Sequence, residues 1–238
     1  MSLAPLHLDW PDCVNARDLG GLPVDGGGTI RERALVRTDS HFHLTEDGLA
    51  AARAYGLSRI IDLRRPAECL QWPSRLADEV TYVNLPVQGE EDPENEPTLA
   101  ELYCAMLDRR PGLFAAVLAA IADAPDGPVV VHCAAGKDRT GIVVALALTL
   151  AGVPDEVIAT DYAVTEERMS ARYDELIERA ANEDEREFWR SIRRALPENM
   201  TIVLGHLRDR YGSVADYLRG GGFTDAQEKA LVDRLITP

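Results

Sequence analysis

Short runs of apolar, often β-branched residues alternate with longer amphipathic stretches over the first 150 residues. Runs of strand length lie at 29–37, 57–63, 80–85 and 129–131, and stretches of helix length lie at 46–55, 99–107, 111–124 and 140–151. Glycine and proline separate them, as at Gly56, Gly127-Pro128 and Gly152. Alternating strands and helices are typical of an α/β domain, so we expect a central, mostly parallel sheet flanked by helices.

Beyond residue 153 the pattern is helical. Periodic apolar positions predict helices over 154–161, 164–181, 185–196, 200–211, 214–219 and 224–236, the last opening with a capping box at Thr224. The apolar stripes of 164–181 and 185–196 fit core packing. Their dense charge elsewhere, and the polar break at 182–185, equally fit a helical lid within 162–200. We expect one domain over 1–238 with a mainly helical C-terminal half.

The segment 129–141 carries the densest chemistry, and it reads V-V-V-H-C-A-A-G-K-D-R-T-G. A strand that runs through a short loop into a helix directs free backbone N–H groups towards one point. The small residues Ala134, Ala135 and Gly136 would let that loop wrap closely around an anion. The pattern predicts a phosphate cradle with Cys133 at its base.

The other side chains of this loop fit the same interpretation. Arg139 lies six residues after Cys133 and can return its planar guanidinium to two phosphate oxygens. The positive surroundings favour thiolate over thiol at Cys133. Thr140 could donate a hydrogen bond to the sulfur, and His132 could brace the loop. A Walker nucleotide-binding loop is excluded, because Asp138 follows Lys137 where that loop has Ser or Thr.

Further candidate chemistry follows the 57–63 strand. Asp62 lies at the carboxyl end of that strand, the ligand-binding edge of a parallel sheet, and is a candidate general acid or supporting residue. Arg64 or Arg65 could add positive charge, whereas Arg65 and Glu68 are interpreted as a solvated ion pair. We expect an acidic loop over 88–97, which contains five carboxylates and two prolines.

Two other motifs have simpler interpretations. Arg17 and Asp18 are expected to pair and to fix the segment 14–40. The pair His41-x-His43 could be metal ligands, but the chain offers only three further histidines. A polar loop before a helix capped by Thr45 is favoured, and no metal or cofactor is expected.

Composition narrows the function classes. The net charge is −15 with 40 acidic and 25 basic residues, which argues against nucleic acid and anionic membranes as partners. No apolar run is long enough for a membrane span. Only two basic residues are lysines, so Lys137 in the cradle is a modest functional signal. Four cysteines without a CxxC pair, and no signal peptide, favour reduced thiols in the cytoplasm.

The string H-C-A-A-G-K-D-R-T-G resembles the signature of cysteine-dependent protein tyrosine phosphatases, in the bacterial branch with Lys-Asp inside the loop. Weaker matches lie at 15–21 (N-A-R-D-L-G-G), 37–39 (R-T-D), 59–64 (R-I-I-D-L-R) and 212–214 (G-S-V). The resemblance to the mycobacterial phosphatase B-type enzymes of this branch implies a phosphatase-like fold, a two-helix lid and a general acid at Asp138. It also implies substrates among phosphotyrosine, phosphoserine, phosphothreonine and phosphoinositides, and leaves open export without a signal.

The expected reaction is phosphate monoester hydrolysis in two steps. Cys133 attacks phosphorus to form a cysteinyl-phosphate, which water then hydrolyses. Asp138 is the first candidate for the general acid, Asp62 the reserve, and Asp12, in the only Trp-Pro-Asp, a distant third. The residues expected to bind the phosphate are Ala134, Ala135, Gly136, Lys137, Asp138, Arg139 and Thr140.

Several alternatives stay open at this point. Lys137 beside Arg139 could bind extra phosphates, as a phosphoinositide phosphatase would require. A rhodanese-like sulfurtransferase also places a cysteine in a strand–helix loop, but Arg139-Thr140 argues against it. A non-catalytic phosphate-binding module would not need every reacting residue. The expected partner is a phosphorylated protein or a phosphoinositide, whereas the sequence gives neither the oligomeric state nor regulation by oxidation of Cys133.

Overall fold

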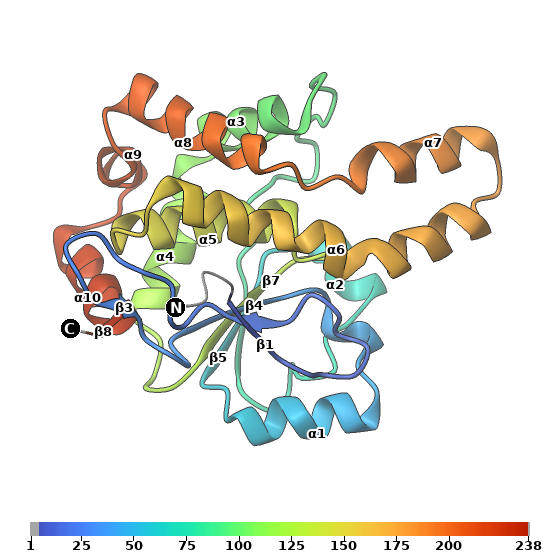
Figure 1. The fold of residues 1–238 in the computed structure, drawn as a ribbon, viewed down its shortest axis with the longest axis horizontal. Helices are drawn as coiled ribbons and strands as arrows, with labels where there is room; N and C mark the ends of the chain where they lie inside the picture. The colour runs from blue at the N-terminus through green and yellow to red at the C-terminus, as the bar shows by residue number, and fades with distance from the viewer. Residues whose placement is uncertain (1–4, 238) are drawn as a thin grey trace.

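A six-stranded sheet runs through the middle of the molecule, which the computed structural model describes over residues 5–237 (Figure 1). Its strands, in spatial order, are β1 (Leu6–His7), β2 (Arg17–Asp18), β4 (Leu35–Thr38), β7 (Val129–His132), β5 (Arg59–Asp62) and β6 (Thr81–Asn84). The last four are mutually parallel, and β1 and β2 add an antiparallel edge. The expected mostly parallel sheet is therefore confirmed.

The central strands are buried on both faces because their side chains alternate between two cores. Ile61, Val129 and Val131 belong to the larger core, whereas Ile60 and Val130 belong to the smaller one. Each central strand therefore carries consecutive buried apolar residues. Their carboxyl ends bring His132 of β7 level with Asp62 of β5 and Thr38 of β4.

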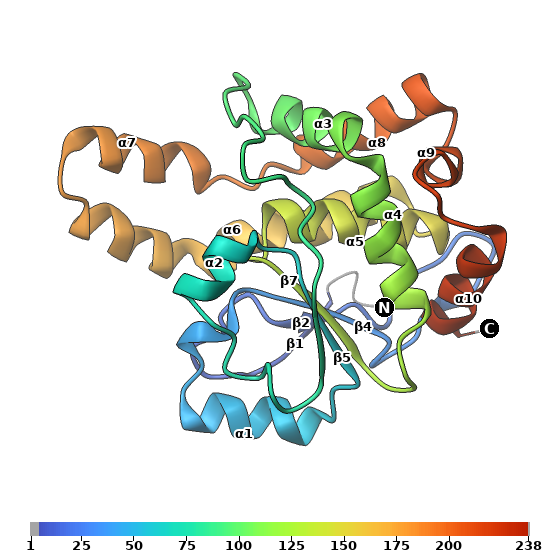
Figure 2. The same ribbon diagram turned by 180° about the vertical axis from the view of Figure 1, so that it is seen from behind.

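Helices cover the two faces unequally. The smaller core lies under α1 (Glu46–Tyr55), which has one face of the sheet largely to itself (Figures 1 and 2). The larger core packs against α3 (Leu99–Arg109), α4 (Pro111–Ala122), α5 (Asp138–Leu150), α8 (Pro197–Tyr211), α9 (Val214–Gly220) and α10 (Asp225–Leu235). Helix α5 is the most deeply buried of these, with nine consecutive buried residues from Thr140 to Leu148. Its first residues, Asp138, Arg139 and Thr140, belong to the predicted phosphate-binding loop.

A helical hairpin extends beyond the rest of the molecule (Figures 1 and 2). It consists of the C-terminal part of α6 (Asp155–Arg179) and the whole of α7 (Glu183–Ile192). The break expected at 162–163 is absent, and α6 is continuous over 25 residues. The polar residues at that point are buried rather than exposed in a loop, and Asp161 and Thr165 both contact Arg17.

The remaining differences between the predicted and the observed secondary structure concern short segments. The expected strand 29–37 is two strands, β3 (Thr29–Ile30) and β4, separated by a turn with Arg33 at φ 62°. β3 pairs with β8 (Ile236–Thr237), a second small sheet. A 3-10 turn, η1 (His41–His43), and α2 (Pro66–Gln71) complete the fold, and the capping box at Thr224 is confirmed. Among residues 5–237, no helix combines the length and the apolar character that crossing a membrane requires.

Candidate active site

The loop between β7 and α5 has its carbonyl groups bound on its outer side. Ala134 O accepts from Ser40 N at 2.8 Å, and Ala135 O accepts from Asn15 Nδ2 at 2.9 Å. Gly136 O accepts from an Arg37 guanidinium nitrogen at 2.8 Å. The backbone N–H groups of 134–136 donate to no described residue, so they are available to bind an anion.

Gly136 is required by two features of the loop. Its φ is +65°, a conformation that favours glycine. A Cβ atom at this position would lie 2.3 Å from Thr38 O of the neighbouring strand. The close approach of the loop to β4 therefore depends on the missing side chain.

A buried ion-pair cluster stands behind the loop. Asp161 of α6 accepts from Arg17 Nε at 2.7 Å and from Arg37 at 2.5 Å, and all three side chains are almost fully buried. Burial alone would raise the pKa of Asp161, but Arg17 and Arg37 outweigh it and lower that pKa below its ordinary value. The cluster connects β2, β4 and α6 to Gly136.

The expected pair between Arg17 and Asp18 is wrong. Consecutive residues of a strand point to opposite faces, so the two side chains diverge. Asp18 instead accepts hydrogen bonds from Gly20 N, Arg33 N and the Tyr55 hydroxyl. Each side chain fixes the segment 14–40, but to different neighbours.

Cys133 and Arg139 lie close enough for their charges to interact. Cys133 is 2% exposed at the base of the loop. Burial alone would lower the pKa of Arg139, but Glu68 and the charge of Cys133 outweigh it and raise that pKa above its ordinary value. The guanidinium of Arg139 therefore stays charged, and the charge of Cys133 acts on it.

Glu68 holds Arg139 in a bidentate pair, with distances of 2.5 and 2.9 Å from its two oxygens to the guanidinium nitrogens. It also accepts from the backbone N of Arg65, within the capping box of α2. The expected ion pair between Arg65 and Glu68 is wrong, because the Arg65 side chain reaches Glu94 at 2.6 Å. The acidic residue in the first turn after Pro66 signalled a capped helix, but not a partner 71 residues away.

Asp138 begins α5 at the rim of the loop. Its Oδ1 accepts a hydrogen bond from the hydroxyl of Tyr103 on α3, and it lies 3.4 Å from Lys137 Nζ. Its side chain is 34% exposed. Burial, followed by the charge of Asp138, raises the pKa of Tyr103 well above its ordinary value, so the phenol remains a donor.

Asp62 is enclosed at the ends of β5 and β7. It accepts from Arg64 at 2.5 Å and from the Tyr82 hydroxyl at 2.7 Å, and His132 Nε2 lies 3.4 Å away. Burial would raise the pKa of Asp62, but His132 and Arg64 outweigh it and hold the pKa well below its ordinary value. His132 in turn contacts Cys133 O through Nδ1 at 3.1 Å, so Asp62 lies behind the loop rather than at its mouth.

Comparison with known proteins agrees with this geometry. The sequence profile described as "Tyrosine phosphatase family" matches residues 8–237. A "Tyrosine-protein phosphatase" from Nostoc commune is 32% identical over 228 residues, which cover 90% of this chain and 78% of that protein. The chain belongs to the tyrosine phosphatase family. It is a phosphatase, a hydrolase that acts on a phosphorylated substrate.

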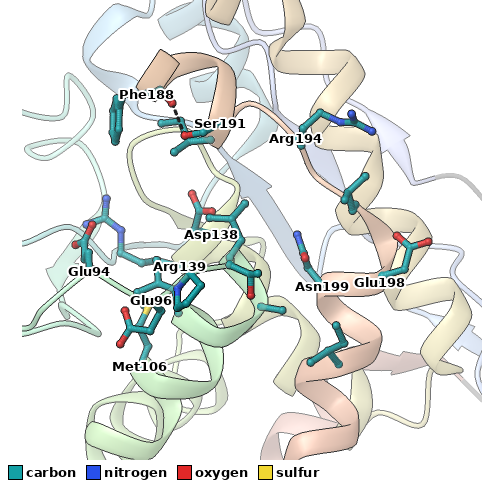
Figure 3. Close-up of a pocket in the computed structure, with 18 of the residues that line it drawn as sticks. Glu94, Glu96, Met106, Asp138, Arg139, Phe188, Ser191, Arg194, Glu198 and Asn199 are labelled. Carbon is teal, nitrogen blue, oxygen red and sulfur yellow. Dashed lines mark hydrogen bonds between the residues drawn. The ribbon is translucent and has the colours of Figure 1, made fainter. Parts of the chain in front are cut away.

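A pocket of about 750 Å³ opens beside Asp138 and Arg139 of the phosphatase (Figure 3). Phe188 and Ser191 of the α6–α7 hairpin form one side, and Glu198 and Asn199 of α8 lie on another. The apolar lining comes from α3 and the segment just before it, the hairpin and α8, namely Pro97, Leu99, Ala100, Leu102, Met106, Phe188, Ile192, Leu196 and Ile202. Three of these lining side chains, Phe188, Leu196 and Ile202, are large hydrophobic residues exposed to solvent.

Lys137 is not among the residues that line the pocket of the phosphatase, although its contacts are. It is fully buried, and its Nζ donates to Ile192 O and, at 3.4 Å, to Arg194 O, where the chain leaves α7. Thr140 Oγ1 is also buried and makes no hydrogen bond with any described residue. The expected hydrogen bond from Thr140 to the sulfur is therefore not formed.

Tyr173 was expected only as part of a packing stripe on α6. Burial raises its pKa, and the charges of Asp138 and Cys133 raise it further, so the Tyr173 phenol is sensitive to the charge of both groups. The sequence could not show this, because a tyrosine in an apolar stripe is equally consistent with simple core packing.

Proposed function

We propose that the phosphatase hydrolyses phosphotyrosine in proteins through a cysteinyl-phosphate intermediate. The observation that carries the proposal is the loop from Cys133 to Arg139. Its carbonyls accept hydrogen bonds from neighbouring segments, its backbone N–H groups at 134–136 donate to no described residue, and the charge of Cys133 acts on the guanidinium of Arg139. Such an arrangement suits a trigonal phosphoryl group, whose equatorial oxygens need several donors at once.

In the first step, the Cys133 thiolate attacks phosphorus, the S–P bond forms and the bond to the tyrosine oxygen breaks. Asp138 supplies the proton that the leaving oxygen takes. In the second step Asp138 accepts a proton from water, which attacks phosphorus and releases phosphate and the thiolate. Arg139, oriented by Glu68, stabilises the phosphoryl oxygens in both steps.

The contacts of the two aspartates favour Asp138 over Asp62 as the acid. A general acid has to carry a proton and reach the leaving group. Asp62 is fully buried behind the loop, with Arg64 and His132 holding its pKa low. Asp138 lines the pocket and is partly exposed.

The pocket supports a protein substrate rather than a polyphosphorylated inositol lipid. Lys137, the cation expected to bind additional phosphates, is occupied by two backbone carbonyls. Arg194 is paired with Glu166 at 2.9 Å, and Glu94, Glu96 and Glu198 would repel a second phosphate. Apolar side chains beside Arg139 suit the residues that flank a phosphotyrosine.

Parallel assays on a phosphotyrosyl peptide, a phosphoseryl peptide and vesicles containing polyphosphorylated phosphoinositide test the proposal. We expect the highest kcat/KM with the phosphotyrosyl peptide. Mass spectrometry after acid quenching should find phosphate on the peptide that contains Cys133, and Cys133→Ser should abolish turnover. Turnover by the serine variant would contradict the mechanism, and faster hydrolysis of the lipid would contradict the substrate class.

We also propose that the phosphatase works in a reducing compartment such as the cytoplasm. Its four cysteines are all free thiols. Oxidation of Cys133 would remove the nucleophile, so activity should depend on thiol reductant. Full activity after prolonged treatment with peroxide would argue against this.

A further inference from the structure

A chain of buried hydroxyl groups ends on Asp138. Tyr103 on α3 donates to Asp138 Oδ1, its oxygen lies 2.8 Å from the hydroxyl of Tyr162 on α6, and Asn199 Nδ2 of α8 lies 3.5 Å from Tyr162. We infer that Tyr103 is a positioning residue, which sets the orientation of the Asp138 carboxyl for proton transfer. The inference rests on the proposed function and deepens it.

Once Asp138 has given up its proton, the donors of this chain run in one direction. An ionised carboxylate accepts hydrogen bonds and cannot donate, so the Tyr103 proton is directed at Asp138. The Tyr103 oxygen then accepts from Tyr162, and the Tyr162 oxygen accepts from the Asn199 amide. Burial raises the pKa of both Tyr103 and Tyr162, so both phenols keep their protons. Each link therefore strengthens the next towards Asp138.

The chain also distinguishes the two oxygens of Asp138. Oδ1 accepts from Tyr103 and lies nearest to Lys137, whereas Oδ2 has no hydrogen bond with any residue from 5 to 237. With Oδ1 held, Oδ2 is the oxygen available to carry a proton towards the substrate and to take one from water. The same orientation thus serves both steps of the reaction.

Removing the hydroxyl while keeping the ring tests this role. We expect Tyr103→Phe to lower kcat/KM for phenyl phosphate, a poor leaving group, by about tenfold, part of the roughly 10²–10⁴-fold that a positioned general acid contributes. For 4-nitrophenyl phosphate, which needs less help from an acid, the change should stay within about twofold. Tyr162→Phe should show the same pattern with a smaller loss.

Tyr217→Phe is the matched control. Tyr217 is 1% exposed, and its hydroxyl donates to Leu107 O at 2.9 Å, away from the catalytic loop. The Tyr217→Phe variant loses one buried hydrogen bond, as Tyr103→Phe does. It should not change how kcat/KM depends on the leaving group. An equal loss of kcat/KM with both phosphate esters in Tyr103→Phe, matched by Tyr217→Phe, would reduce Tyr103 to a structural role.

A double variant shows whether Tyr103 acts through Asp138 or independently of it. If Tyr103 acts through Asp138, then Asp138→Asn with Tyr103→Phe should be no slower on phenyl phosphate than Asp138→Asn alone. A full additional loss would overturn the inference. If Tyr103→Phe does not fold, as judged by thermal unfolding, the same comparison is made with Tyr162→Phe. Turnover that survives in Cys133→Ser would instead contradict the proposed function, whatever the tyrosine variants show.

Discussion

Aspartate–arginine ion pairs support both the proposed catalytic loop and the α6–α7 hairpin, but the two sets of pairs differ in burial. Behind the loop, Arg17, Arg37 and Asp161 form ion pairs with side chains at most 1% exposed. On the hairpin, Asp174 pairs with Arg193 at 3.0 Å, with side chains 57% and 30% exposed. Exposed pairs contribute little to stability, whereas a buried charge without its partner is costly. The loop that we propose acts on phosphate is therefore held firmly, and the hairpin that we propose meets the rest of the substrate is held weakly.

The hairpin joins the rigid region at a few defined points. Lys137 binds the carbonyls of Ile192 and Arg194, and Glu166 accepts from Ala195 N at 2.9 Å and pairs with Arg194. Helix α7 itself has no buried residue. The inner part of α6 belongs to the core, so the lid expected within 162–200 stays a prediction for the part of the hairpin beyond Tyr173.

The largest effect is expected where the buried pair is broken. Asp161→Asn leaves two buried guanidinium groups without a carboxylate, and should lower the free energy of unfolding by about 3–5 kcal/mol. Asp174→Asn, on the same helix and also paired with an arginine, should have little effect. Urea unfolding of the wild type, Asp161→Asn and Asp174→Asn measures the loss of unfolding free energy in each variant. Equal losses in the two variants would contradict the contrast between the regions.

The pH dependence of that loss has a definite sign. Because Arg17 and Arg37 lower the pKa of Asp161 in the folded state, its stabilisation is present above the ordinary aspartate pKa of about 3.9 and is lost as pH falls through the folded value. The gap in unfolding free energy between wild type and Asp161→Asn should be constant near neutral pH and narrow below about pH 4. A gap that widened on acidification would show that Asp161 is not ionised in the folded protein.

Arg139→Lys should affect turnover without affecting stability greatly. A lysine cannot supply two parallel hydrogen bonds to the phosphoryl oxygens, so kcat should fall by about 10²–10³-fold. Steady-state kinetics with a phosphotyrosyl peptide measures the loss, with circular dichroism as the control for folding. A variant that kept most of its kcat would show that the guanidinium does not bind the transferred group.

A smaller loss is expected when the support of Arg139 is weakened. Glu68→Gln keeps the shape of the side chain but removes the charge, so the guanidinium is held less firmly. We expect kcat/KM to fall by roughly tenfold, since misplacement of a catalytic group by an ångström can cost about 10²-fold. Inhibition by inorganic phosphate should weaken in parallel. Unchanged kinetics would make the Glu68 pair a structural contact only.

The proposed catalytic loop stands out in the sequence because the groups proposed to react lie within a few consecutive residues. The strand ending at His132, the thiol, the glycine and Arg139 can be recognised without knowing any long-range contact. The alternation of strands and helices likewise predicted the sheet and most helices within a few residues, since periodicity is a local property.

The supporting residues could not be predicted in the same way. Asp161 and Arg17 are 144 positions apart, Glu68 and Arg139 are 71 apart, and Tyr103 and Asp138 are 35 apart. Nothing local distinguishes Asp161 from the exposed acidic residues of α6. The predicted helices accordingly ended at 161 and began again at 164, whereas the fold buries Asp161 between two arginines within one continuous helix.

Lys137→Met tests the junction between the two regions. Without the ammonium group, the carbonyls of Ile192 and Arg194 lose their donor, so amide hydrogen exchange should quicken over 188–196 and stay unchanged in α5. Activity on a phosphotyrosyl peptide should change only modestly. If the variant instead lost activity selectively on polyphosphorylated phosphoinositide, Lys137 would be a phosphate ligand rather than an anchor of the hairpin.

Phe188→Ala should give the smallest effect, because it alters only the weakly held wall. Phe188 is 53% exposed and lines the pocket beside Asp138 and Arg139. Partial burial of its ring against a peptide would contribute about 1 kcal/mol, so KM for a phosphotyrosyl peptide should rise about fivefold while kcat is kept. KM for 4-nitrophenyl phosphate, which is too small to reach the hairpin, should not change. Leu70→Ala is the control, since Leu70 is an exposed apolar side chain on α2 outside the pocket lining. Equal changes with both substrates would mean that Phe188 supports the catalytic loop, and the division between a fixed catalytic region and a separate substrate wall would then fail.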